Sequence, residues 1–267
     1  MIDLKTKGYT VIPNFLTQEE IDIFLADYNK VRYNTFSNHP ATVTRLSLDL
    51  PIQIFLKLSK VAKQSGLQVD LLLPGGLYTS TESMNMLWHQ DHQSFYFNQQ
   101  LYNYLNFYII LEKDDPMLSG LSVIPFDTLT NLAPNHVSTL INSGAKRFYP
   151  LGSVTRVFDD SNGDGWGLPV NIETIKESPK LSAGDLFLIR GDVIHKTQDA
   201  STKRIALSIR WADSFAPVSF EKIQQGCRYK IDWLSMYQER FSVTFNKVET
   251  VTCQEFYEKM FPESYTI

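Results

Sequence analysis

The stretch from Leu87 to Asp91 holds two side chains whose types and spacing suit metal binding. His89 and Asp91 are two residues apart, so on a β-strand both project from the same face. One imidazole nitrogen and one carboxylate oxygen on a rigid strand make two thirds of a facial metal triad. The third ligand should be a histidine far downstream, on a strand that ends near the first, and His195 fits this position. We therefore predict a metal site at His89, Asp91 and His195.

A second pattern follows His195, where residues 204–211 alternate in character. One face of this predicted strand is small and cationic, and the other is apolar. The first face holds Arg204, Ala206, Ser208 and Arg210, and the second holds Ile205, Leu207, Ile209 and Trp211. Such a strand suits a barrel that holds a small anion. Arg204 offers a planar fork for a carboxylate, and the alanine and serine leave room beside it.

Two helices are predicted before the strands that carry these residues. Thr17 and Glu20 have the spacing of a capping box, and apolar residues then recur at helical spacing. A second helix should begin near Pro51, a good first-turn residue, and end at Gly66. Its buried face is predicted to hold Ile52, Phe55, Leu56 and Val61.

From Leu67 onward, short strand-like runs alternate with turn residues, as in a sandwich or barrel. The predicted strands cover residues 67–73, 77–81, 84–89, 104–111, 121–124, 185–190 and 204–211, with a short strand over 8–13 before the helices and a last helix over 253–260. Residues 127–180 are predicted to be a long irregular region, which in a compact domain is usually functional or mobile.

These elements predict a mainly β fold with supporting α-helices, a double-stranded β-helix of the jelly-roll or cupin-like barrel type. We expect one domain over residues 1–267. Residues 1–66 would form an N-terminal helical support, residues 67–215 the barrel core with an insertion at 127–180, and residues 216–267 a C-terminal extension.

Composition excludes several classes of protein. The 267 residues are 43% hydrophobic, ample for one large core. The net charge is −4 and the basic residues are scattered, so no stripe for nucleic acid is present. No apolar run is long enough for a membrane span, the N-terminus is polar, and the two cysteines have no zinc-site spacing. We expect a soluble cytoplasmic protein with no nucleic-acid or membrane partner, whose oligomeric state the sequence does not indicate.

Three blocks of sequence, taken in order, resemble the phytanoyl-CoA dioxygenase family of Fe(II)- and 2-oxoglutarate-dependent dioxygenases. The first is GYTVIPNFLT at residues 8–17. The second is WHQD at 88–91, followed by the strand 104–111 and by SGLSVIP at 119–125. The third runs from AGD at 183–185 through His195 to RIALSIRW at 204–211. Each block alone is common, but the ordered set is specific and spans most of the chain.

The resemblance implies roles for individual residues. His89, Asp91 and His195 would ligate Fe(II), with 2-oxoglutarate and O2 as co-substrates. Arg204 would hold the distal carboxylate of 2-oxoglutarate, Thr197 would assist it with a hydroxyl group, and Asn106 would bond the proximal carboxylate. The sequence departs from the family at Lys196, where a glycine is usual, and at residues 126–128, where Gly-Ser-His is usual. These departures concern the rim of the pocket more than the metal chemistry.

The resemblance also implies a reaction, the oxidation of a small-molecule substrate with decarboxylation of 2-oxoglutarate to succinate and CO2. Halogenases of this fold lack the carboxylate ligand, so Asp91 favours hydroxylation or a related desaturation or ring closure. Arg210, Tyr96 and Tyr108 are candidate substrate residues, although packing explains the tyrosines nearly as well and a structural ion pair would explain Arg210.

Other interpretations remain open at this point. Any single histidine is more often structural than a metal ligand, and His92 should point away from His89 and Asp91 on a continuing strand. A cupin-like metalloenzyme without a keto acid would have the triad but no need of Arg204. A non-catalytic barrel that binds a ligand or a partner would not need an intact triad. A hydroxylase of peptide or nucleic acid is a further alternative, which the scattered charge disfavours for nucleic acid.

Overall fold

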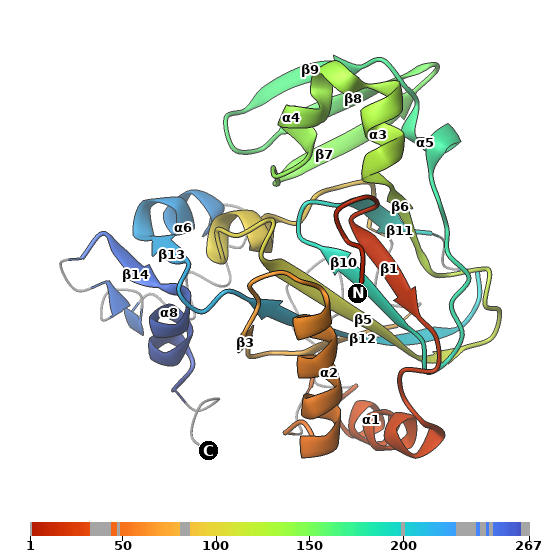
Figure 1. Ribbon diagram of the computed structural model, residues 1–267, viewed down its shortest axis with the longest axis vertical. Helices are drawn as coiled ribbons and strands as arrows, with labels where there is room; N and C mark the ends of the chain where they lie inside the picture. The colour runs from red at the N-terminus through yellow and green to blue at the C-terminus, as the bar shows by residue number, and fades with distance from the viewer. Residues whose placement is uncertain are drawn as a thin grey trace.

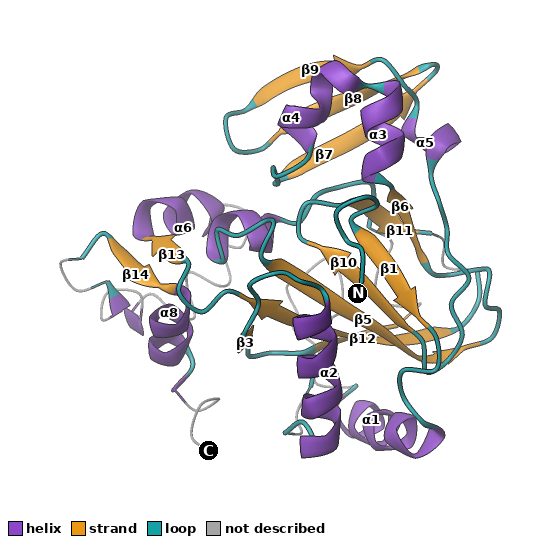
Figure 2. Cartoon of the chain, viewed as in Figure 1, coloured by secondary structure: helices purple, strands orange, loops and turns teal. Residues whose placement is uncertain are grey.

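The computed structural model describes residues 2–32, 44–46, 49–80, 86–198, 201–227, 239–240, 244–245 and 248–262. Most of the connection between the two predicted N-terminal helices and the first part of the predicted strand 84–89 lie outside the described residues. Within this part of the chain, two antiparallel sheets form the middle of the molecule, with helices packed at its edges (Figures 1 and 2). This is the mainly β architecture with supporting helices that the sequence predicts.

The larger sheet contains seven strands among the described residues. Its order is β1 (Tyr9–Ile12), β10 (Leu186–Arg190), β5 (Tyr104–Lys113), β12 (Arg204–Ala212), β4 (Leu77–Ser80) and β2 (Thr44–Arg45), with β3 (Leu71–Leu72) also paired to β12. The two longest strands, β5 and β12, pair from Arg204 opposite Lys113 to Ala212 opposite Tyr104. The predicted strands 104–111, 185–190 and 204–211 are therefore confirmed to within two residues.

The second sheet is assembled around His89. Strand β11 (Ile194–Thr197) pairs with β6 (Leu121–Ile124), and β7 (Lys146–Leu151), β8 (Val154–Asp159) and β9 (Asp164–Leu168) pair in order. His89 forms one β-bridge with His195 and another with Arg147, so its segment lies between β11 and β7. The backbone bonds on the two sides are His89 N–H to the His195 carbonyl, 2.9 Å, and Gln90 N–H to the Lys146 carbonyl, 2.9 Å.

Alternation along β5 and β12 separates two packing faces. Phe107, Ile109, Leu207 and Ile209 pack with helices α1 (Gln18–Val31) and α2 (Ile52–Gln64), which cover one face of the large sheet. Tyr108, Ile110 and Ala206 point the other way and pack with Val123 of β6 and Phe187 of β10. The face of β12 that was predicted to be small and cationic thus points into the interior between the two sheets.

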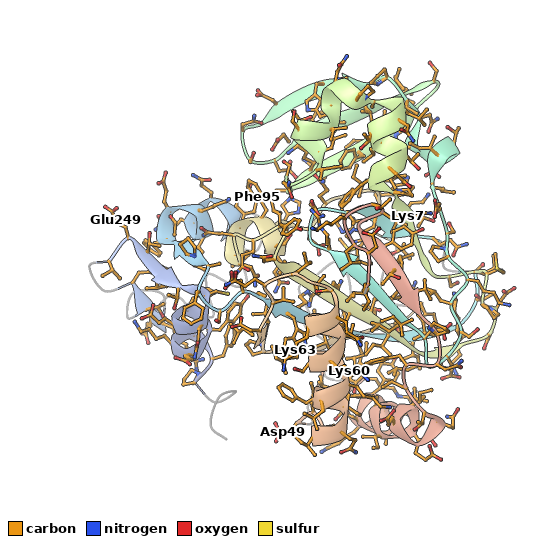
Figure 3. All side chains as sticks on the ribbon, in the orientation of Figure 1. Lys7, Asp49, Lys60, Lys63, Phe95 and Glu249 are labelled. Carbon is orange, nitrogen blue, oxygen red and sulfur yellow. The ribbon has the colours of Figure 1, made fainter. Side chains whose placement is uncertain are left out.

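The capping box of α1 is confirmed, because Thr17 accepts from the Glu20 backbone and Glu20 accepts from that of Thr17. The predicted buried face of α2 is correct for two residues and wrong for two. Val61 is buried and Phe55 packs against the core partly buried, but Ile52 and Leu56 are 67% and 59% exposed. Ile54, Leu58 and Ala62 are buried in their place. Lys60 and Lys63 mark the solvent side of this helix (Figure 3). Apolar residues occupy more than one face of α2, so packing against the sheet decides which of them are buried.

Residues 127–180 are not irregular, and this prediction is wrong. The region contains β7, β8 and β9 together with α3 (Phe126–Leu132), the 3-10 turn η2 (Pro134–His136), α4 (Val137–Leu140) and α5 (Ile172–Ile175). Its apolar residues form one core with Trp88 and Ile194, from the two segments that carry the predicted histidine ligands. The three-stranded sheet and its helices form the layer at the top of Figure 1.

The C-terminal part of the chain packs behind the segment that follows Asp91. It comprises β13 (Pro217–Ser219), α6 (Phe220–Cys227), β14 (Thr250–Thr252) and α8 (Cys253–Met260), the last as predicted. Phe256 and Tyr257 share a core with Tyr96 and Phe97 of the π-helical turn η1 (Gln93–Phe97). The division of the chain into support, core, insertion and extension remains a prediction. None of the helices in the described ranges has the length and apolar character needed to cross a bilayer.

Candidate metal centre

The three predicted ligands come together between the two sheets. His89 Nε2 lies 3.5 Å from Asp91 Oδ1, and His195 Nε2 lies 3.8 Å from the same oxygen. The three ligand atoms all lie within 4.8 Å of one another. A search of the described histidine, cysteine, aspartate and glutamate side chains for groups of three or more that could hold a metal ion gives this group. β11 positions His195, and the segment bridged to it positions His89, with Asp91 two residues further on. The described part of the predicted strand 84–89 forms only the isolated bridges of His89, so it is not a strand.

Each histidine ring is fixed in the tautomer that a metal ligand needs. His89 Nδ1 lies 2.7 Å from the carbonyl oxygen of Leu87, and His195 Nδ1 lies 2.9 Å from that of Val193. Because a carbonyl oxygen only accepts, Nδ1 carries a proton in each ring, and Nε2 is the nitrogen that faces the other two predicted ligands. Such bonds to the far ring nitrogen orient ligating histidines and make them better donors.

The electrostatics of the cluster favour a charged Asp91 carboxylate and a neutral His195. Burial raises the pKa of Asp91, but the hydrogen bond with His89 and the nearby His195 and Arg210 outweigh burial and hold the pKa below its usual range. Burial, together with the nearby His89, lowers the pKa of His195 to about 4. At neutral pH the cluster therefore presents one negative oxygen ligand and an unprotonated nitrogen at His195.

Residues that point away from the cluster hold its segment in place. The Gln90 side chain is fully buried, and its Nε2 donates to the carbonyl oxygens of Leu140, 2.6 Å, and Asp192, 2.7 Å. Glu173 of α5 accepts from Trp88 Nε1, 2.7 Å, and from Lys196 Nζ, 2.5 Å. Because Trp88 precedes His89 and Lys196 follows His195, one carboxylate joins the two histidine-bearing segments. The departure from the family at Lys196 thus has a structural explanation.

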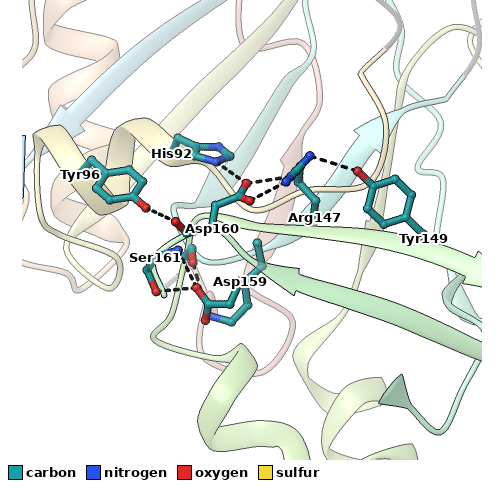
Figure 4. A network of polar contacts seen from close by, with 9 residues as sticks. His92, Tyr96, Arg147, Tyr149, Asp159, Asp160 and Ser161 are labelled. Atoms are coloured by element: carbon teal, nitrogen blue, oxygen red, sulfur yellow. Dashed lines mark hydrogen bonds and ion pairs between the residues drawn. The ribbon is translucent and has the colours of Figure 1, made fainter. Parts of the chain in front are cut away.

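A polar network connects the segment after Asp91 to β7 (Figure 4). His92 Nε2 lies 3.0 Å from Asp160 Oδ2, and the same carboxylate accepts from Arg147 Nε, 2.8 Å, and Nη2, 2.6 Å. Tyr96 donates its hydroxyl proton to the Asp160 carbonyl oxygen, 2.9 Å. His92 therefore lies outside the ligand cluster, as predicted, and anchors the turn that leaves Asp91.

The residues assigned to 2-oxoglutarate lie on the strands that border the interior. Arg204 is 2% exposed, and its Nη1 donates to the Ser119 carbonyl oxygen, 2.7 Å. Thr197 Oγ1 accepts from the backbone N–H of Met86, 3.1 Å. Asn106 Oδ1 accepts from Ser208 Oγ, 2.7 Å, across the β5–β12 pair. These contacts fix the positions of the three side chains, and their roles in binding 2-oxoglutarate remain predictions.

The three candidate substrate residues differ in their surroundings. Arg210 is paired with Asn106 across β5–β12, and its Nε is buried with no hydrogen-bond partner in the described chain. The Tyr108 hydroxyl is buried and is equally without a partner there. Tyr96 is 0% exposed within the C-terminal core. Its hydroxyl group donates to the Asp160 carbonyl oxygen, and its predicted substrate role remains a prediction.

Tyr104 belongs to the same cluster of tyrosines in the sequence as Tyr96 and Tyr108, a cluster that could line a substrate pocket. Tyr104 stands two residues before Asn106, so strand alternation places it on the same face as Asn106 and Tyr108. Its hydroxyl group is buried without a partner in the described part of the chain. Burial raises the pKa of Tyr104, and Arg210 opposes this because its guanidinium group lies next to the Tyr104 hydroxyl, in a contact too poorly aligned to satisfy either group. The tyrosine therefore lies beside Arg210 and the cluster.

The donor set fits a divalent transition metal. Two imidazole nitrogens and one carboxylate on one side of a site are the usual ligands of non-haem iron(II). Ligand atoms about 2.0–2.2 Å from a metal ion lie roughly 3–4 Å from each other, close to the separations of His89, Asp91 and His195. Little movement would be required for these side chains to bind a shared ion.

No protein-family model and no curated protein matches this sequence. Similar solved structures exist. The epimerase SnoN of nogalamycin biosynthesis, in complex with Fe3+, alpha-ketoglutarate and nogalamycin RO, has 15% identity and a TM-score of 0.52 over 79% of this chain and 81% of that one. The carbocyclase SnoK of the same biosynthesis has 14% identity and a TM-score of 0.50 over 80% and 83%. EctD from S. alaskensis, with 2-oxoglutarate and 5-hydroxyectoine, has 10% identity and a TM-score of 0.50 over 79% and 74%.

The chain has the jelly-roll fold of these proteins. The fold prediction is therefore confirmed, as two facing sheets rather than a closed barrel among the described strands. At these identities the likeness concerns fold alone. The predicted membership of the phytanoyl-CoA dioxygenase family has no matching family model and remains a prediction.

Proposed function

We propose that this protein is an Fe(II)- and 2-oxoglutarate-dependent oxygenase that oxidises a small molecule. The observation that carries the proposal is the triad of His89, Asp91 and His195, with both Nδ1 atoms held by backbone carbonyls and the ligand atoms within 4.8 Å of one another. Support comes from the jelly-roll fold, which it shares with proteins described as alpha-ketoglutarate dependent. When bound, the metal and 2-oxoglutarate supply O2 activation, with succinate and CO2 as products.

The residues of the chain have distinct tasks in this proposal. Asp91 supplies negative charge to the metal site, and the two histidines supply nitrogens whose orientation is fixed before a metal binds. Arg204 provides a buried guanidinium for the distal carboxylate of 2-oxoglutarate. Thr197 adds a hydroxyl group, and Asn106 retains an amide nitrogen because its oxygen is bonded to Ser208.

The finer parts of the proposal rest on the chemistry of the site. We infer hydroxylation as the reaction because the carboxylate ligand Asp91 is present, although similar folds carry out epimerisation and ring closure. Membership of the phytanoyl-CoA dioxygenase family is supported by the three ordered sequence blocks. A small molecule is the proposed substrate because the net charge is −4 and no basic stripe is present for nucleic acid.

The test is an anaerobic titration of the purified apoprotein, first with Fe(II) and then with 2-oxoglutarate. The expected result is a weak visible metal-to-ligand charge-transfer band that disappears in oxygen while succinate forms. An iron complex that takes up no keto acid would overturn the proposal in favour of a cupin-like metalloenzyme. A protein that binds neither would be a ligand-binding module rather than an oxygenase.

A further inference from the structure

Three polar atoms on the inner face of β5 and β12 are buried without a partner in the described part of the chain. They are the hydroxyl oxygens of Tyr104 and Tyr108 and Nε of Arg210. Residues 104, 106 and 108 alternate onto one face, and Arg210 pairs with Asn106 while Ser208 pairs with Tyr108. Buried polar groups in folded proteins are normally hydrogen-bonded. Three unpaired ones on one patch indicate a surface whose bonds are completed by a ligand.

This patch lies beside the metal ligands. Ser94 donates to the carbonyl oxygen of Asp91, 3.2 Å, and of Gly191, 3.1 Å, so it joins the Asp91 segment to the turn after β10. That turn rests on Tyr104, because a Cβ added at Gly191 would meet Tyr104 Cδ1 and Ser94 Cβ, each at 2.9 Å. Arg210 lies near enough to Asp91 and His195 to influence the pKa of both. The patch therefore lies close to the predicted metal ligands.

The two inward arginines of β12 have different neighbours. Arg204 and Arg210 are six residues apart, so their Cα atoms are separated by roughly 20 Å along the strand. Arg204 Nη1 donates to the Ser119 carbonyl oxygen, whereas Arg210 lies near Asp91 and Tyr104. Between the two arginines stand Ala206 and Ser208, both small and buried. The strand thus offers two separate anion sites, one at each end of its inner face.

We propose that Arg210, Tyr104 and Tyr108 form a site for a carboxylate group of the substrate. The proposal rests on the proposed function, in which Arg204 holds the co-substrate. Arg210 Nε donates only, and burial keeps the proton on Tyr104, so the site offers hydrogen-bond donors to an acceptor-only group. One guanidinium with neutral hydroxyls matches a monoanionic carboxylate better than a doubly charged phosphate. The bound anion would place the neighbouring carbon atoms beside the metal site.

The test uses the intact protein with Fe(II) and saturating 2-oxoglutarate, without oxygen. Isothermal calorimetry compares two probe pairs of matched shape, benzoate with benzamide and hexanoate with hexanamide. The expected result is that a carboxylate binds at least ~10-fold more tightly than its amide, and that Arg210→Gln removes this preference. Arg210→Lys should restore part of it, and Tyr104→Phe should weaken it by ~3–10-fold. Circular dichroism and thermal unfolding confirm that each variant is folded.

The matched control is Arg156→Gln. Arg156 is an exposed arginine of β8 whose guanidinium lies over the Phe158 ring, 4.7 Å away. This variant should keep the full carboxylate preference. The proposal is wrong if neither carboxylate is preferred to its amide, or if Arg210→Gln leaves the preference intact.

A second readout separates the two anion sites. Titration of the charge-transfer band gives the 2-oxoglutarate affinity, which Arg210→Gln should change by less than ~3-fold and Arg204→Gln should weaken strongly. The reverse result would make Arg210 the clamp for 2-oxoglutarate and would overturn the substrate site. Absence of the band in the unmodified protein would instead refute the proposed function. In that case the carboxylate preference of the apoprotein, compared with that of Arg210→Gln using the same probes, tests the anion site independently of the proposed function.

Discussion

The inner faces of the two sheets differ in how far their polar groups are satisfied. On the second sheet, His89 and His195 each have Nδ1 bonded to a backbone carbonyl. Oδ1 of Asp91 lies within 4 Å of the Nε2 atoms of both rings. On the larger sheet, Tyr104, Tyr108 and Arg210 present buried polar atoms with no partner in the described chain. The first face is organised before any ligand binds, whereas the second offers bonds that only a ligand can complete.

This difference matches the two kinds of ligand that the site would have to accept. A metal ion requires fixed donors at short distances, which the carbonyl-anchored rings and the Gln90 and Glu173 contacts behind them provide. An organic substrate brings its own oxygen atoms, so the facing side chains can remain unpaired until it arrives. Substitutions on the second sheet should therefore affect metal binding and stability, and those on the larger sheet should affect organic ligands.

The largest effect is expected from Asp91→Ala on the second sheet. Loss of the only carboxylate in the triad should abolish Fe(II)-dependent formation of succinate from 2-oxoglutarate, because two neutral nitrogens hold the ion poorly. The far-ultraviolet circular dichroism should not change. The control is Asp164→Ala, which removes an exposed carboxylate of β9 and should leave turnover intact. Full activity of Asp91→Ala would remove Asp91 from the metal site.

The next effect concerns the larger sheet. Arg204→Gln should raise the 2-oxoglutarate concentration needed for half-saturation ~30–1000-fold, because it removes a charge-assisted contact to a carboxylate in a buried setting. Fe(II) affinity without the keto acid should stay the same, since Arg204 is not among the ligands. The measurement is anaerobic titration of the charge-transfer band. An unchanged half-saturation would show that Arg204 does not bind the co-substrate.

Several strands, the start of α1 and the metal ligands could be predicted from the sequence because they depend on local signals. Short strand-like runs between turn residues predicted β6 and β10, and alternation with a period of two predicted β12. The capping box at Thr17 predicted the start of α1. The proximity of His89, Asp91 and His195 followed from ligand chemistry together with the spacing of the first two. Each of these signals lies within a few residues of chain.

Features that depend on distant contacts could not be predicted. Pro150, Gly165 and Gly167 weaken the strand signal of β7 and β9, yet pairing with the His89 segment fixes β7 in the sheet. On α2, Ile52 and Ile54 are equally apolar, and only packing against the large sheet decides that Ile54 is buried. Whether a buried hydroxyl finds a partner is likewise a property of the folded chain, as Tyr96 and Tyr108 illustrate.

A smaller effect is expected behind the metal face. Gln90→Leu leaves the carbonyl oxygens of Leu140 and Asp192 without their side-chain donor, which should lower the free energy of unfolding by about 2–3 kcal/mol. Urea unfolding of the metal-free protein measures this loss. Gln254→Leu, at an exposed position of α8, serves as the control and should change stability by less than ~0.5 kcal/mol. Equal stability of the two variants would mean that Gln90 does not support the His89 segment.

The smallest effect concerns the carboxylate of Glu173, which joins the two histidine-bearing segments from outside. Burial opposes ionisation, but the bonds from Lys176, Lys196 and Trp88 outweigh it and lower the pKa of Glu173 from 4.5 to about 2. A depressed pKa contributes stability above pH 4.5, and this is lost as the pH falls towards 2. Because the side chain is 35% exposed, solvent screening leaves a contribution on the order of 1 kcal/mol.

Glu173→Gln should therefore be less stable than the unmodified protein at neutral pH, and urea unfolding across this window should show the difference shrinking as the pH falls. The exposed Glu258→Gln should show no such trend, and a constant difference for Glu173→Gln would mean that the charge of Glu173 does not hold the two segments together.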